Sequence, residues 1–99
     1  MSLINLLQDD PNFSFGIVGM TAGVQALVQD DELDPLEYLM RHLQGDWGDL
    51  SDEDQQANAD ALAHGNRVLS SYKVSEDQWL WIITEADRSI TTLLLPEEY

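Results

Sequence analysis

The sequence predicts one small α+β domain, in which two to three helices pack on one face of a three- to four-stranded antiparallel sheet that ends in a C-terminal β-meander. The chain has 99 residues, 43% of them hydrophobic, which suits a single core. Apolar residues recur with helical spacing in the middle of the chain and with a period of two in its last third. Helices grouped on one face of an antiparallel sheet define the α+β class.

The N-terminal part of the chain contains a tail, a strand and a short helix. Residues 1–13 are expected to form a flexible tail of the single domain 1–99, and they lack the basic start of a signal peptide. Residues 15–20 are short, β-branched and bounded by turn residues, which predicts a strand. Thr21 can then cap a helix over residues 22–29.

Two longer helices are predicted in the middle of the chain. Asp34 with Pro35 is a typical helix start, and Gly45 is a typical helix end. The stripe between them has the spacing i, i+3, i+4 and i+7 and consists of Leu36, Leu39, Met40 and Leu43. Ser51 is expected to cap a further helix that ends at about His64. The predicted inward face of this helix is small and consists of Ala57, Ala61 and Leu62.

Three strands are predicted in the last third of the chain. Residues 68–74 alternate between two faces, residues 78–84 are apolar on both, and residues 90–95 precede a proline. The connections are short enough for hairpins. Trp79 and Trp81 share one face of the second strand. We expect them to form core against the helices, because a stacking platform for bases would need basic neighbours.

The net charge limits the choice of partner. Nineteen carboxylates face only four cations, and the formal net charge is −15. DNA, RNA and anionic membranes require a basic footprint, so direct binding to them is not expected. A basic protein partner, a cation or simple solubility is compatible with this charge. The chain has no cysteine and no apolar run near the ~20 residues of a membrane span, so we expect a cytoplasmic protein without a cofactor.

The carboxylates are concentrated in the helical part of the chain. Residues 30–60 contain eleven of them and one arginine. If the exposed helix faces share one side, these carboxylates imitate duplex phosphates and compete for the basic groove of a nucleic-acid-binding protein. A solvated acidic surface without a partner is the alternative. The residues expected to contact a basic partner are Trp47, Asp46, Asp49, Asp52, Glu53, Asp31, Glu32 and Glu37.

Trp47 has two interpretations that the sequence leaves open. It lies in a short loop between Gly45 and Gly48 and is flanked by two aspartates, Asp46 and Asp49. An exposed tryptophan in an acidic loop is a suitable anchor for a basic partner. In the alternative, Trp47 folds back as a lid over the core, and Gly48 permits the tight turn.

His42, Asp46 and Asp49 form a candidate metal site. All three lie near the predicted end of a helix, and an imidazole with two carboxylates suits a divalent cation. In the alternative, His42 interacts with the last helix carbonyls and the aspartates cap turns. The spacing matches no strong metal motif.

Glu85, Asp87 and Arg88 form a candidate acid–base site in a predicted hairpin. Paired carboxylates beside an arginine can transfer protons. In the alternative, the carboxylates hydrogen-bond the turn and the arginine neutralises them. No nucleophile or glycine-rich phosphate loop accompanies them.

One longer pattern is specific to the second half of the chain. It consists of His42 with residues 45–50, residues 70–72, residues 80–89 with Thr91 and Thr92, and residues 94–99. In this pattern the chain resembles a family of small bacterial proteins carried on plasmids, phages and integrative elements, usually described as plasmid-related. The resemblance covers residues 16–99 and departs at Ala22, where the family has a proline. It implies a mobile-element context and no particular activity.

Charge and resemblance together lead to one main expectation. The protein is expected to be a non-enzymatic, acidic interaction protein of a mobile element that modulates or inhibits a nucleic-acid-processing complex through a basic surface on the partner. The alternative is a small metal-dependent enzyme or ligand-binding domain that uses one of the two residue groups above. A third hypothesis is an acidic subunit of a homo-oligomer built through the edge of the C-terminal strand.

Overall fold

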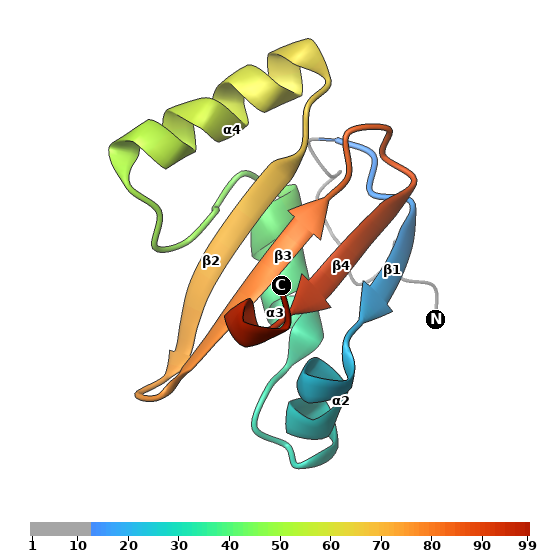
Figure 1. Cartoon of the computed structure of the whole chain (residues 1–99), viewed down its shortest axis with the longest axis vertical. Coiled ribbons are helices and arrows are strands. Elements are labelled where there is room, and N and C mark those ends of the chain that lie inside the picture. Colours follow the sequence, from blue (N-terminus) through green and yellow to red (C-terminus); the bar gives the residue numbers. More distant parts are fainter. Residues whose placement is uncertain (1–12) are drawn as a thin grey trace.

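The computed structural model describes residues 13–99, and this range contains a four-stranded sheet and three α-helices (Figure 1). The elements in chain order are β1 (Ile17–Met20), α2 (Ala22–Gln29), α3 (Pro35–Leu43), α4 (Asp52–His64), β2 (Val68–Ser75), β3 (Gln78–Thr84), β4 (Ile90–Leu94) and the 3₁₀ helix η1 (Pro96–Glu98). The α+β class and the predicted helices and strands are confirmed.

The sheet is mixed, so the expectation of a purely antiparallel sheet is wrong. Its strand order is β1-β4-β3-β2. The last three strands form the predicted antiparallel meander, but β1 lies parallel to β4, with Ile17 opposite Ile90. A parallel pair needs a long connection, which the three helices and the first hairpin supply. The C-terminal strand therefore lies inside the sheet, and an oligomer built on its edge is excluded.

The helices α2 and α3 cover one face of the sheet, and α3 lies behind the sheet in Figure 1. Asp34 accepts a hydrogen bond from Leu36 N–H at 3.1 Å and so caps α3. At its other end Gly45 is left-handed, with φ of 88°, as the sequence predicts. The buried apolar residues of this layer and the sheet face below it are Val24, Leu33, Leu39, Leu43, Tyr72, Leu80, Ile82 and Leu93.

The helix α4 is bonded to the outer edge of β2. Its buried residue Asn58 donates from Nδ2 to the Leu69 carbonyl at 2.6 Å and accepts from Leu69 N–H at 3.1 Å. Ala61 is buried as predicted, but Ala57 is exposed. The expected inward face was therefore wrong by one position. A side-chain amide can both donate and accept, so Asn58 satisfies the C=O and the N–H of Leu69 at the strand edge together.

Trp79 and Trp81 lie on the face of β3 opposite to Leu80 and Ile82. The expectation that they form core against the helices is wrong, because α2 packs on the face of Leu80 and Ile82, and Trp79 is 37% exposed. Trp81 is half-buried and packs edge-on against Tyr99, with ring centroids 5.6 Å apart. The other face of β3, with the aliphatic side chains of Leu80 and Ile82, lies in the centre of the core.

The end of the chain is attached to the start of α2. The Glu98 carboxylate accepts hydrogen bonds from the Thr21 hydroxyl and from Gly23 N–H, the latter at 2.9 Å. It also accepts from Leu95 N–H at 2.9 Å. These bonds lower the pKa of Glu98, the one from Thr21 most strongly. A carboxylate at a helix N-terminus is also favoured by the helix dipole.

The expected tail, residues 1–13, lies outside the described residues except for Phe13. Its ring packs edge-on against His42, with centroids 5.4 Å apart. Within the described part of the chain, no helix has the length and apolar character needed to cross a membrane.

We predict that Asn58→Asp lowers the free energy of unfolding by about 2–4 kcal/mol, measured by urea denaturation at pH 7. The new carboxylate still accepts from Leu69 N–H, but it repels the Leu69 carbonyl to which Asn58 donates. Asn66→Asp, at an exposed position, adds the same charge and serves as the control. It should change stability by no more than about 0.5 kcal/mol. Equal losses in the two variants would contradict the role of Asn58.

Candidate functional site

His42 is completely buried in the last turn of α3 and is the centre of a chain of hydrogen bonds. Its Nδ1 lies 2.5 Å from Ser70 Oγ in β2, and its Nε2 lies 2.9 Å from Thr84 Oγ1 in β3. Thr84 Oγ1 lies 2.7 Å from Thr91 Oγ1 in β4, and Thr91 donates to the Phe15 carbonyl at 2.8 Å. This chain of hydrogen bonds therefore joins α3 to β2, β3 and β4, and also to Phe15, which precedes β1.

The direction of these hydrogen bonds assigns the imidazole proton. The Phe15 carbonyl can only accept, so Thr91 donates to it and Thr84 donates to Thr91. Thr84 then offers only a lone pair to His42, so Nε2 carries the proton and Nδ1 accepts from Ser70. Burial lowers the pKa of His42 from 6.5 to about 3, which keeps the ring neutral at physiological pH.

The predicted metal site of His42, Asp46 and Asp49 is not assembled, because both ring nitrogens are hydrogen-bonded inside the core. Asp46 instead pairs with Arg41, at 2.7 Å. Asp49 accepts from Lys73 N–H at 3.3 Å. Within residues 13–99, no three His, Cys, Asp or Glu side chains are grouped closely enough to hold a metal ion.

The loop between α3 and α4, residues 45–50 (the edge loop), continues the sheet beyond β2. Ser71 donates its N–H to the Trp47 carbonyl at 3.1 Å, and its own carbonyl accepts from Asp49 N–H at 2.7 Å. The next outward-facing N–H, that of Lys73, is taken by the Asp49 carboxylate. Together with α4, the edge loop protects the β2 edge from pairing with another chain.

The environment of Trp47 is intermediate between the two that were predicted, exposed loop and buried lid. Its side chain is half-buried, and its Nε1 is enclosed without a hydrogen-bond partner among residues 13–99. Gly48 has φ of 79°, and a Cβ atom there would lie 2.2 Å from the Ser71 carbonyl oxygen and 2.6 Å from the Tyr72 ring. Only glycine permits this close approach. The loop is thus held against β2 while part of the indole remains accessible.

Arg41, Asp46 and Tyr72 connect the edge loop to the core. Tyr72 donates its hydroxyl to the Asp46 carbonyl at 2.6 Å, and the Arg41 guanidinium lies 4.7 Å from the centre of the Tyr72 ring. The hydrogen bond between Arg41 and Asp46 lowers the pKa of Asp46 and raises that of Arg41. Burial raises the pKa of Tyr72. Asp46 is therefore already compensated and contributes less to a partner surface than its neighbours.

Glu85, Asp87 and Arg88 form a structural turn. The Arg88 guanidinium donates to the Asn66 carbonyl at 2.7 Å and to two further carbonyls, in the turn itself and in the last turn of α4. Asp87 accepts from the N–H and the hydroxyl of Ser89, which lowers the pKa of Asp87. No hydrogen bond joins the carboxylates of Glu85 and Asp87 in the described structure.

The eight residues expected to contact a basic partner fall into two groups. One group lies along the β2 edge and consists of Asp46, Trp47, Asp49, Asp52 and Glu53. The other lies at the connection between α2 and α3, at the bottom of Figure 1, and consists of Asp31, Glu32 and Glu37. The acidic residues in the range 30–60 are therefore spread over two places, and Glu32 of the second group lines the same hollow as Asp77 of the β2–β3 turn.

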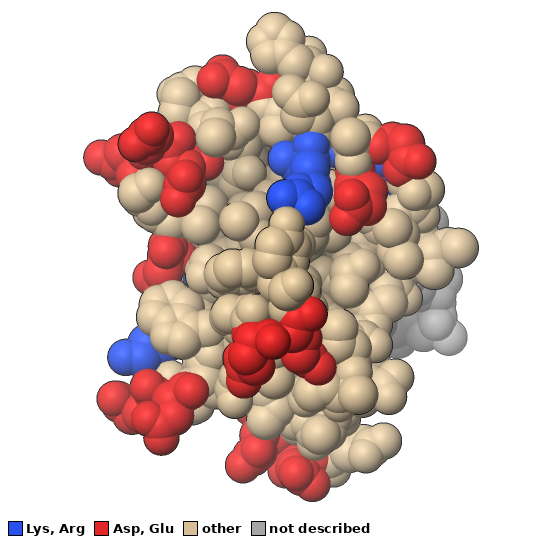
Figure 2. All heavy atoms as spheres, viewed as in Figure 1, with Lys and Arg blue, Asp and Glu red and all other residues tan. Residues whose placement is uncertain are grey.

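Figure 2 shows acidic atoms along the side of the molecule where α4 and the β2–β3 turn lie. We define the acidic edge as the exposed carboxylates of the edge loop, the first turn of α4 and the β2–β3 turn: Asp46, Asp49, Asp52, Glu53, Asp54, Glu76 and Asp77. Asp54 was not among the predicted contact residues, and neither were the last two, Glu76 and Asp77. Only the pairing of strands brings their turn to the same edge.

Sequence reasoning also missed the buried partners of His42. The only signal was positional, since His42 lies one turn after Leu39 on the buried stripe and Ser70 alternates with Tyr72 on the buried strand face. A polar residue at such a position needs a partner. Which hydroxyls meet the imidazole depends on strand pairing, which sequence spacing does not specify.

Comparison with protein-family models gives no match, and searches of the curated proteins and of the solved structures give none either.

We predict a pH-dependent stability that originates from His42. The ring has a pKa near 6.5 when unfolded and about 3 when folded. The stabilisation is therefore fully present above pH 6.5 and is lost as the pH falls toward 3, because the unfolded chain takes up the proton first. The stability difference between wild type and His42→Gln should shrink by up to about 1.4 kcal/mol per pH unit below 6.5.

Urea denaturation between pH 7.5 and 4.5 measures this difference. His64→Gln, which removes an exposed histidine at the end of α4, should retain the steep fall of the wild type. In parallel, NMR of the wild type should show the neutral Nε2–H tautomer of His42 down to about pH 4. A ring that titrates near pH 6 would refute the assignment.

Proposed function

We propose that the protein is a non-enzymatic interaction protein whose acidic edge binds a basic surface on a protein partner. The supporting observation is the concentration of exposed carboxylates along an edge whose backbone groups are already covered by α4 and the edge loop. Arg41 and Lys73 are the cations beside these carboxylates, and Arg41 is engaged by Asp46. A partner therefore meets a strongly negative side-chain surface.

Such a surface acts mainly through its field. With a net charge of −15, the chain attracts basic partners and repels acidic ones over the screening length. The accessible part of Trp47 lies among these carboxylates and supplies an apolar contact for a docked partner. Charge thus favours fast, salt-sensitive association, and the indole helps to position the bound partner.

In its concrete form, the proposal is that the acidic edge competes with nucleic acid for a nucleic-acid-processing complex. The six residue steps from Leu69 to Ser75 span about 20 Å at ~3.3 Å per residue. Measured along the axis of duplex DNA, this length corresponds to about six phosphates of one strand. A protein of a plasmid, phage or integrative element that acts in the cytoplasm gains from blocking such a complex of its host.

The test compares two triple variants with identical net charge. Glu53→Lys, Glu76→Lys and Asp77→Lys reverse charges on the acidic edge. Asp30→Lys and Glu37→Lys at the α2–α3 end, together with Glu97→Lys in η1, reverse charges outside it (the α2–α3 variant). All six side chains are exposed, and none makes a hydrogen bond within residues 13–99. We expect the edge variant to capture at least tenfold less of a basic nucleic-acid-binding protein from source-cell lysate than the wild type.

The α2–α3 variant should retain most of the capture, and wild-type capture should fall between 50 and 300 mM NaCl. A labelled DNA or RNA duplex should be displaced from the captured protein by the wild type and not by the edge variant. Equal losses in both variants would show an effect of net charge alone, and salt-independent capture would exclude an electrostatic interface.

A further inference from the structure

The second edge of the sheet, formed by β1, differs from the β2 edge in its backbone. Ile17 and Thr21 donate their N–H groups toward β4, to the carbonyls of Ser89 and Leu93, each at 3.0 Å. Backbone groups alternate in direction along a strand, so those of Val18 and Met20 point away from β4. Among residues 13–99 these outward-facing groups have no hydrogen-bond partner.

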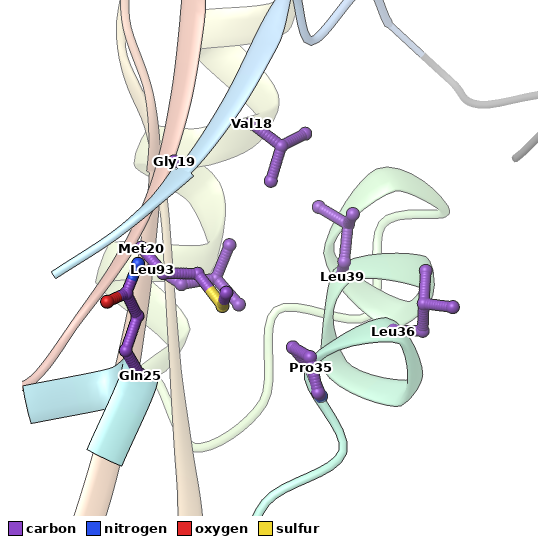
Figure 3. Close-up of a pocket in the computed structure, with 8 residues that line it drawn as sticks. All are labelled: Val18, Gly19, Met20, Gln25, Pro35, Leu36, Leu39 and Leu93. Carbon is purple, nitrogen blue, oxygen red and sulfur yellow. The ribbon is translucent and has the colours of Figure 1, made fainter. Parts of the chain in front are cut away.

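An apolar groove lies beside this edge, between β1 and α3. It has a volume of about 500 Å³, and Figure 3 shows Val18, Met20 and Leu93 on its sheet side and Pro35, Leu36 and Leu39 on its helix side. A strand added to β1 would place every second side chain over this groove. The groove and the open edge therefore form one surface for an extended chain.

The opposite face of the same edge is also apolar. Ile17 is 73% exposed, and Ile90, its neighbour in β4, is 36% exposed. Neither β1 nor β4 contains a charged residue. The rest of the surface carries many carboxylates, so another acidic molecule meets fewer like charges at this edge. The carboxylate beside it, that of Glu98 at Thr21, is already held by three hydrogen bonds.

We propose that a second copy of this chain binds at the β1 edge, with the two β1 strands antiparallel across a two-fold axis. In the register that places Val18 opposite Met20 of the second copy, the outward-facing groups of both strands form four backbone hydrogen bonds. Ile17 then lies opposite Thr21 of the second copy on one face, and Met20 of the second copy reaches the groove on the other.

Charge selects a second copy over a basic partner at this surface. A basic segment has no carboxylate on β1 or β4 to meet, whereas a second copy brings an edge that is equally uncharged. The two-fold axis also leaves the acidic edge of each copy at the outer ends of an eight-stranded sheet. The dimer must still overcome repulsion between two molecules of charge −15, so salt should strengthen it.

Sedimentation equilibrium of the full chain from 5 to 500 µM tests the dimer. We expect a concentration-dependent dimer whose association constant rises several-fold between 50 and 500 mM NaCl, opposite to the salt dependence expected for the basic partner. Ile17→Lys should weaken dimerisation at least tenfold, because it introduces a charge at the edge. Trp79→Lys, at an exposed apolar position on β3, should leave it unchanged.

Hydrogen exchange by NMR locates the interface. The amides of Val18 and Met20 should become protected in the wild type as its concentration rises, and should remain unprotected in Ile17→Lys. A monomer at 500 µM would overturn the proposal. Protection of these amides in a species that sediments as a monomer would also overturn it, since a segment of the same chain would then cover β1. Because the acidic edge is not part of this interface, either proposal can fail while the other stands.

Discussion

The buried imidazole of His42 meets hydroxyl groups from β2 and β3, and through them β4 and the carbonyl of Phe15. Polar atoms inside a core are tolerated only when each of them has a partner, and a partly satisfied network costs more than an apolar core. The relative positions of α3, the three strands and the entry to β1 are therefore coupled. The edge loop follows α3 directly, so the position of Trp47 depends on the same chain of hydrogen bonds.

The two edges of the sheet have opposite properties, and this difference organises the surface. At β2 the backbone is covered by Asn58 and by the edge loop, so an approaching molecule meets carboxylates. At β1 the backbone of Val18 and Met20 faces outward beside apolar side chains, so an approaching molecule meets hydrogen-bonding groups and hydrocarbon. A long acidic edge and a short uncharged edge give one small domain two surfaces with different chemistry.

Local signals in the sequence were sufficient for the helices. The cap at Asp34, the apolar stripe of α3 and the left-handed Gly45 act within a few residues of each other, and all three are present in the structure. The parallel pairing of β1 and the burial of Asn58 depend on contacts between distant segments, which periodicity does not contain. For the same reason, the carboxylates of residues 30–60 could be counted from the sequence but not assigned to a common side.

The parallel pairing of β1 with β4 also sets an order of events during protein synthesis. Ile17 lies opposite Ile90, about 70 positions later in the chain. At 5–20 residues per second, a ribosome needs roughly 4–15 s to make the intervening segment. Throughout this interval the first strand lacks its only sheet neighbour among the described strands. In the nascent chain, β1 therefore remains unpaired for longer than any other strand of the sheet. Chaperones can bind this apolar strand during that time.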